Sequence, residues 1–130
     1  LGFLSQVKNN TKVLKTLEVY FKKYIYDNNI ESAYDITLSI INNVGNYTTE
    51  QLIFLKAVAI SDEVLELSMI LKDEKGTFDL SSVPEDLRLK ATLSFYSLYN
   101  KDEEINSKLM YLRDNSLDIE LRKYLTEILE

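Results

Sequence analysis

The sequence predicts an all-α domain, and three observations support this fold class. Only three Gly and one Pro occur in 130 residues, which is too little turn chemistry for a many-stranded sandwich or barrel. Apolar residues recur at steps of three and four, the spacing of one helix face. Predicted helix pairs start near residues 12, 49 and 84, at intervals of 37 and 35 residues. Such periods are typical of an α-solenoid of stacked antiparallel hairpins, and an irregular helical bundle is the alternative.

The first predicted hairpin covers residues 12–43. Its first helix spans about 12–26, and the apolar face consists of Leu14, Leu17, Phe21 and Tyr24. The Asn-rich segment 27–29 interrupts this pattern. A second helix is expected over about 30–43, with Ala33, Thr37, Ile40 and Ile41 on one face. Because the link is short, the two helices are expected to be antiparallel neighbours.

The second predicted hairpin pairs a helix over about 49–60 with a further helix through residues 65–71. The apolar positions of the first are Leu52, Leu55, Ala59 and Ile60. Those of the second are Leu65, Leu67, Ile70 and Leu71. Ser61 and Asp62 are expected to end the one helix and cap the next. Residues 73–83 contain Gly and Ser residues ahead of Pro84 and predict a loop.

The third predicted hairpin comprises helices over about 84–99 and 102–113, and a last helix runs from about 117 to the end. The apolar positions of the hairpin are Leu87, Ala91, Phe95, Leu98, Tyr99, Ile105, Leu109 and Leu112. Those of the last helix are Leu117, Leu121, Tyr124, Leu125 and Ile128. The pattern therefore leaves the last helix without a hairpin partner.

The first hairpin resembles a tetratricopeptide repeat. The W-x2-L-G-x2-Y…A-x3-F pattern of that family falls on Leu17, Tyr20, Phe21, Tyr24, Ala33 and Thr37. Phe21 stands where the family has Gly, and Thr37 where it has an aromatic residue. Tyr96 and Ile105 in the third hairpin follow Tyr24 and Ala33 by 72 residues, about two repeats. The resemblance covers mainly residues 14–45 and 86–109.

This resemblance implies a concave groove lined by the first helix of each hairpin. The residues it places there are Lys15, Glu18, Lys22, Ile25, Leu87, Lys90, Ser94 and Ser97. Lysines in such a groove commonly hold the carboxylate of a ligand in this family. The resemblance therefore implies a surface for peptide recognition.

Charge is distributed unevenly along the chain, whose net charge is −6. Residues 1–26 contain five Lys against one Glu, which leaves a net charge of −10 on residues 27–130. Lys8, Lys12, Lys15 and Lys22 are spaced to form one basic stripe on the first helix. The stripe would suit an acidic peptide or a carboxylate terminus, while an ordinary solvated helix face is the simpler interpretation. Nucleic acid is not expected, because the acidic remainder would repel a polyanion.

Six residues are the candidates for partner contact. Tyr26 lies off the apolar face of the first helix, and the others come from the basic stripe or the implied groove. The full set is Lys12, Lys15, Lys22, Tyr26, Lys90 and Ser94. A homodimer, in which the basic end of one copy meets the acidic body of another, is the alternative to a foreign partner.

Composition excludes several kinds of chemistry. The chain has no Cys and no His, so it has no thiol nucleophile, imidazole base or ordinary zinc site. No two Gly are close enough for a phosphate-binding loop. The acidic residues 102–104 are expected to cap a helix. No catalytic, cofactor or metal-binding residues are predicted, and we expect no enzyme.

The sequence thus predicts one helical domain over residues 1–130, expected to be a piece of a larger protein because it starts with Leu1. Its apolar runs fall far short of the roughly 20 residues that span a membrane. Lack of Cys favours the cytoplasm. The predicted function is non-catalytic binding of a protein or peptide, as an adaptor or scaffold. The alternative is a ligand-sensing or oligomerisation domain of a larger regulatory protein.

Overall fold

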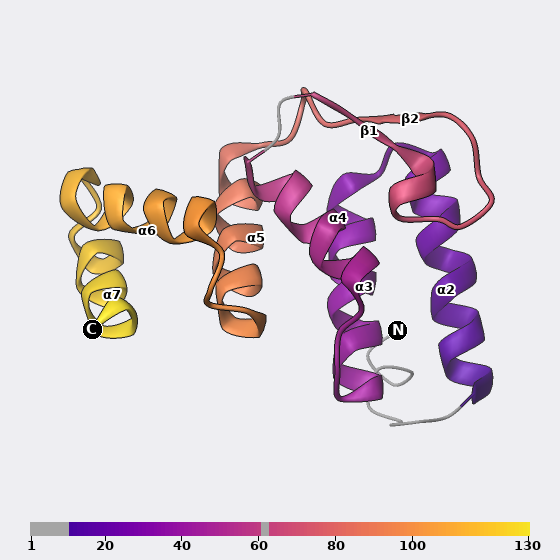
Figure 1. The fold of residues 1–130 in the computed structure, drawn as a ribbon, viewed down its shortest axis with the longest axis horizontal. Helices are drawn as coiled ribbons and strands as arrows, with labels where there is room; N and C mark the ends of the chain where they lie inside the picture. Colours follow the sequence, from indigo (N-terminus) through magenta and orange to yellow (C-terminus); the bar gives the residue numbers. More distant parts are fainter. Residues whose placement is uncertain (1–10, 61–62) are drawn as a thin grey trace.

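The computed structural model describes residues 11–60 and 63–130, which form six α-helices and one two-stranded antiparallel hairpin (Figure 1). The prediction of a mostly helical chain is confirmed. The helices are α2 (Thr11–Tyr26), α3 (Ile30–Val44), α4 (Thr49–Ile60), α5 (Glu85–Leu98), α6 (Glu103–Asn115) and α7 (Ile119–Leu129). Between α4 and α5 lie β1 (Val64–Glu66), the short 3-10 helix η1 (Leu67–Met69) and β2 (Thr77–Asp79).

Side-chain caps fix where several of these helices begin. Asn29 precedes α3 and its Oδ1 accepts from the amide of Ser32. Asp102 caps α6 by accepting from the amide of Ile105, and Asp118 caps α7 by accepting from the amide of Leu121. At the other end of α3, Gly45 adopts a φ of 84°, a conformation that glycine reaches without a steric cost. These caps explain why the predicted helices lie close to the observed ones.

The predicted helix through residues 65–71 is wrong. Residues 64–66 are extended, and Leu65 is opposite Phe78 in the register of the β1–β2 pair. Phe78 is buried, whereas its neighbours Thr77 and Asp79 are exposed. The apolar run in this segment is too short to separate helix from strand by its spacing, so the pairing of distant segments decides. The predicted loop over 73–83 is correspondingly wrong where it contains β2.

Because residues 65–71 form no α-helix, the observed helix pairs differ from the predicted ones. α2 packs along α3 as predicted, but α4 packs along α5, and α6 packs along α7. The predicted second hairpin therefore does not exist, and the last helix has a partner. The three pairs follow one another along the long axis of the molecule (Figure 1). The expected boundary at Ser61 and Asp62 lies outside the described residues.

One large core runs through these pairs, with Phe54 fully buried near its centre. The Phe54 ring meets Phe21 edge-on at 5.4 Å and Phe78 at 6.4 Å between ring centroids. A smaller cluster between α2 and α3 contains Val13, Leu17, Ile36 and Ile40. Aromatic side chains thus join α2, α4 and β2 in a single packing unit.

The segment from 63 to 83, here called the arm, extends from the end of α4 to α2. Figure 1 shows the arm crossing above the ends of α2, α3 and α4, with η1 beside α2. The arm is fastened at the far end, where Glu74 pairs with Lys22 of α2. This placement adds a wall to the surface formed by the helices and creates the site described next.

Candidate functional site

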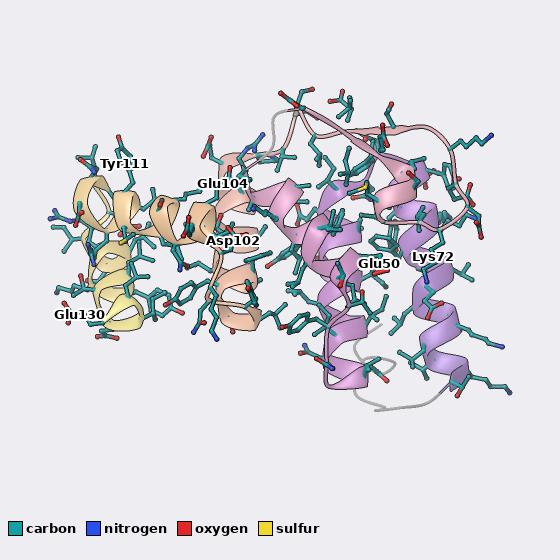
Figure 2. The ribbon with its side chains drawn as sticks, in the orientation of Figure 1. Glu50, Lys72, Asp102, Glu104, Tyr111 and Glu130 are labelled. Atoms are coloured by element: carbon teal, nitrogen blue, oxygen red, sulfur yellow. The ribbon has the colours of Figure 1, made fainter. Side chains whose placement is uncertain are left out.

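A hollow of about 330 Å³ lies where α2, α3 and α4 meet the arm. Its apolar lining combines side chains from all four segments, namely Phe21, Ile40, Phe54, Ile70 and Leu71. Its polar lining includes Glu18, Glu50 and Lys72. In Figure 2, Glu50 and Lys72 lie close together at this hollow, one from α4 and one from the arm. The hollow therefore has an apolar floor and charged groups at its edge.

A second hollow of about 410 Å³ lies between α2 and residues 71–74 of the arm. It is lined by Lys15, Glu18, Val19, Lys22, Leu71, Lys72 and Glu74. Three lysines face two glutamates here, so the lining has a net positive charge within a chain that is acidic overall. Val19, at 68% exposure, gives this hollow an uncovered apolar contact.

The two hollows share Glu18, Leu71 and Lys72 and so adjoin each other along α2. We call them together the groove, with an apolar half at α3 and α4 and a cationic half at Lys15 and Lys22. Apolar surface beside positive charge is suited to a ligand that carries both apolar and acidic groups. The lining of the groove therefore combines apolar contacts with charged groups.

Glu74 occupies the outer end of the cationic half. One carboxylate oxygen pairs with the Lys22 ammonium, and the other accepts a hydrogen bond of 2.5 Å from the Tyr26 hydroxyl. The hydrogen bonds from Lys22 and Tyr26 hold the pKa of Glu74 below its usual value. The same contacts raise the pKa of Lys22 and of Tyr26. All three groups therefore keep their usual charge states at neutral pH.

The structure brings part of the predicted set of binding residues together. Lys15 and Lys22 line the groove, and Tyr26 lies beside them through its bond to Glu74. Lys12 is exposed on the same helix but does not line the groove. The predicted stripe also includes Lys8, which lies outside the described residues.

Lys90 and Ser94 lie elsewhere, on α5. The Tyr34 hydroxyl of α3 is 2.6 Å from Ser94 Oγ and donates to the Lys90 carbonyl at 3.2 Å. Ser94 therefore joins α5 to α3, and neither residue lines the groove. The contact between these helices uses the side chain of Ser94 but only the backbone of Lys90.

The opposite wall of the groove was not predicted from the sequence. Leu71, Lys72 and Glu74 belong to the arm, where a helix and a loop were predicted. Glu74 is 52 residues away from Lys22 in the sequence, so no local spacing links them. The sequence signal related to this wall was the excess of positive charge on α2, which suits an acidic partner but does not identify one.

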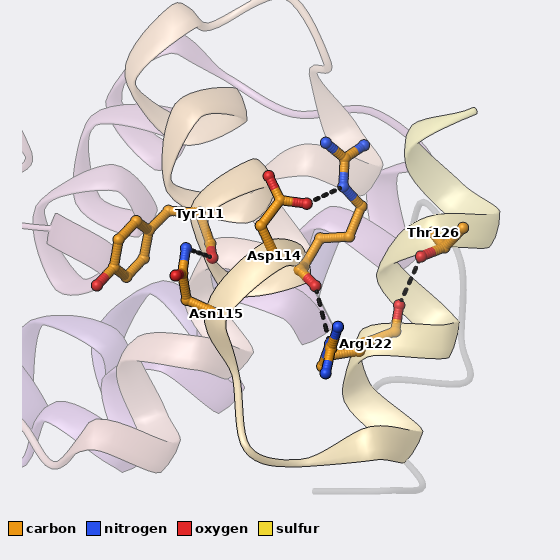
Figure 3. A network of polar contacts seen from close by, with 6 residues as sticks. Tyr111, Asp114, Asn115, Arg122 and Thr126 are labelled. Atoms are coloured by element: carbon orange, nitrogen blue, oxygen red, sulfur yellow. Dashed lines mark hydrogen bonds and ion pairs between the residues drawn. The ribbon is translucent and has the colours of Figure 1, made fainter.

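A polar hollow of about 610 Å³ at the far end of the molecule lies between α6 and α7. Figure 3 shows its contacts: Arg122 donates to the carbonyl of Arg113 at 3.2 Å, and Arg113 bonds to Asp114 at 3.1 Å. Thr126 donates to the carbonyl of Arg122. The bond between Arg122 and Arg113 joins the two helices, and most of the residues that line this hollow are charged.

Two further observations concern metal binding and membrane spans. Over residues 11–60 and 63–130, no group of three or more acidic side chains is arranged to hold a metal ion. Among the helices of the described ranges, none has the length and apolar character needed to cross a membrane. No family model, curated protein or solved structure matches this chain.

Proposed function

We propose that this chain is a non-catalytic helical module that binds a protein or peptide, as an adaptor or scaffold, and that the groove is its binding surface. The observation that carries the proposal is the adjacency of an apolar hollow and a cationic hollow, whose linings share Glu18, Leu71 and Lys72. The occupant that matches this surface is a short segment in which apolar residues adjoin acidic ones.

The dimensions of the groove support a peptide as the occupant. A volume of about 330 Å³ is at the small end of the range for ligand sites, which is roughly 300–1,000 Å³. It has room for one or two apolar side chains, which would cover Phe21 and Leu71. The adjoining cationic half is open along α2, so a chain can continue from one half to the other.

The proposal includes a repeat architecture of the tetratricopeptide-like kind. Its support is the succession of the α2–α3, α4–α5 and α6–α7 pairs along the molecule. The arm is an insertion between the two helices of the middle pair. Stacked pairs present a continuous side surface, and the first pair together with the arm then provides the site for recognition.

Fluorescence anisotropy with labelled peptides tests this function. The probes are a peptide with two leucines followed by four glutamates, a second with glutamines in place of the glutamates, and a third with serines in place of the leucines. We expect the first to bind more tightly than the other two. Its affinity should also fall as salt rises, since exposed charges are screened.

Two variants locate the binding. Leu71→Ala should weaken binding of the first peptide, because Leu71 lines both halves of the groove. Leu112→Ala, a half-buried leucine on α6, is the matched control and should bind like the wild type. Equal affinity for all three peptides, or no binding up to about 1 mM, where the binding free energy is only about 4 kcal/mol, would overturn the proposal.

A second candidate function, oligomerisation, is favoured by the surface of α6 and α7. Leu117 is 99% exposed in the turn between them. Met110, Tyr111, Ile119 and Tyr124 are also exposed. Exposed apolar side chains that come from one helix pair fit an interface with another copy. Light scattering at low and high salt tests this function. A dimer held by apolar contacts persists at high salt, whereas a dimer held by basic and acidic surfaces dissociates. A monomer at both salt concentrations excludes oligomerisation.

A further inference from the structure

We infer that Glu74 is a built-in competitor for the groove, and that a partner binds by placing its own carboxylate where the Glu74 carboxylate now lies. This inference rests on the proposed function, because it names the chemistry of the partner at that same site. It adds a specific class of ligand: a segment with at least two neighbouring acidic residues beside an apolar residue.

The contacts of Glu74 are those of a bound carboxylate ligand. Its two oxygens are held separately, one by the Lys22 ammonium and one by the Tyr26 hydroxyl. Lys22 and Tyr26 are four residues apart on α2, so they lie on one face one turn apart. Both donors thus come from one rigid helix, whereas the acceptor comes from the arm. The helix surface is a preformed receptor for any carboxylate that reaches it.

The Glu74 segment is held to α2 by few interactions. Residues 72–76 have no regular secondary structure, and Lys72, Asp73 and Lys75 around Glu74 are exposed. The Glu74 amide makes a long hydrogen bond of 3.3 Å to Leu71, and Asp73 has a φ of 65°. The arm is anchored on either side by the buried residues Ile70 and Phe78. Glu74 can therefore leave α2 while the rest of the arm keeps its packing.

Two further cations explain why the partner needs more than one carboxylate. Exchange of one carboxylate for another on Lys22 gains little free energy by itself. Lys15 and Lys72 also line the cationic half, and neither has an ion pair within the described part of the chain. A second acidic residue of the partner would pair with one of these lysines. The net gain then comes from this new pair and from the apolar half of the groove.

Removal of the competitor tests the inference with the leucine–glutamate peptide described above. Glu74→Gln leaves an oxygen that accepts from Tyr26 but removes the charge that holds Lys22. We expect this variant to bind the peptide about twofold to fivefold more tightly, the range that corresponds to an exposed ion pair. The peptide with glutamines should show no such gain, because it has no carboxylate to place on Lys22.

Asp73→Asn is the matched control. It removes one negative charge from the same loop, and asparagine tolerates the positive φ of this position. It should raise affinity less than Glu74→Gln does, since Asp73 is not paired with α2 in the described structure. Glu74→Ala provides a second variant, with circular dichroism to show that the helices are intact. Lys22→Met should weaken binding of the acidic peptide, while Lys101→Met, in the link between α5 and α6 and outside the lining of the groove, should not.

The results separate this inference from the proposed function. If Glu74→Gln and Glu74→Ala bind the acidic peptide no more tightly than Asp73→Asn, the competitor role is overturned, whereas the Leu71→Ala result still decides the function. If neither the wild type nor the Glu74 variants bind any of the peptides, both proposals fail. Tighter binding confined to the Glu74 variants and to the acidic peptide supports the inference.

Discussion

The Nζ atom of Lys56 in α4 lies 2.8 Å from Oδ2 of Asp102, the residue that caps α6. The other oxygen of Asp102 accepts from the amide of Ile105 at 3.0 Å. One carboxylate thus starts α6 and ties it to α4, and Figure 2 shows Asp102 and Glu104 at this junction. Lys108 of α6 adds a bond of 2.5 Å to the carbonyl of Ala59 at the end of α4.

Two variants separate the roles of Asp102. Asparagine caps a helix as well as aspartate does, so Asp102→Asn should lose only the ion pair, at a cost below about 1 kcal/mol. Asp102→Ala loses the cap as well and should lower the free energy of unfolding by about 1–2 kcal/mol. Urea unfolding followed by circular dichroism measures both. Equal effects of the two variants would show that the cap contributes nothing.

Acid should remove the contribution of the Asp102 ion pair. Burial raises the pKa of Asp102, but the hydrogen bonds from Lys56 and Ile105 outweigh it and hold the pKa below the usual 3.8. A lowered pKa stabilises the folded state above the unfolded pKa, and this contribution is lost as the pH falls through the folded pKa. The difference in unfolding free energy between wild type and Asp102→Asn should therefore be constant near neutral pH and shrink below about pH 3.8. A difference that grew in acid would contradict this assignment.

Tyr34→Phe should destabilise the chain by about 1 kcal/mol, because it removes the hydroxyl that joins α3 to Ser94 and Lys90 of α5. Tyr111→Phe is the control, since Tyr111 is 66% exposed, and we expect no change for it. A double-mutant cycle with Ser94→Ala measures the coupling directly. Additive effects of Tyr34→Phe and Ser94→Ala would show that the two hydroxyls do not interact, and would return Ser94 to the candidates for partner contact.

Ala33 is fully buried between α2 and the core, at 0% exposure. Ala33→Leu should lower the free energy of unfolding by roughly 1–3 kcal/mol through overpacking. Asp35→Leu, at an exposed position of the same helix, is the matched control and should change stability little. Thermal unfolding of both variants gives the comparison. A neutral Ala33→Leu would mean that α2 and α3 can move apart without cost.

The helices that the sequence located correctly are those with both a clear period and a clear end. α3 shows why: Ala33, Ile40 and Ile41 face the core, and Asn29 and Gly45 stop the helix at each end. The apolar run at 64–71 is too short for its spacing to separate helix from strand, and the helix predicted there is wrong. Its strand conformation depends on Thr77–Asp79, which supplies the hydrogen bonds of the β1–β2 pair.

One wall of the groove could be predicted from the sequence, and the other could not. The basic face of α2 was predictable, because Lys15 and Lys22 follow from helical spacing alone. The other wall was not, since Leu71, Lys72 and Glu74 reach α2 only through the course of the arm. The difference between the predicted and observed helix pairs also comes from the conformation of the arm. With no helix in the arm to pair with, α4 covers its apolar surface with α5 instead.

Local periodicity and capping therefore determined, from the sequence by itself, where the helices lie and which side of α2 carries the positive charge. These are short-range properties, fixed within a few residues by backbone geometry and the need to satisfy helix ends. The tertiary structure alone decided which helices pair, that the arm forms a β-hairpin, and that Glu74 lies on Lys22 and Tyr26. The contacts of Glu74 join residues about 50 apart in the chain. Like the helix pairing and the β-hairpin, they depend on burial of the apolar groups around Phe54 and Phe78 in one core.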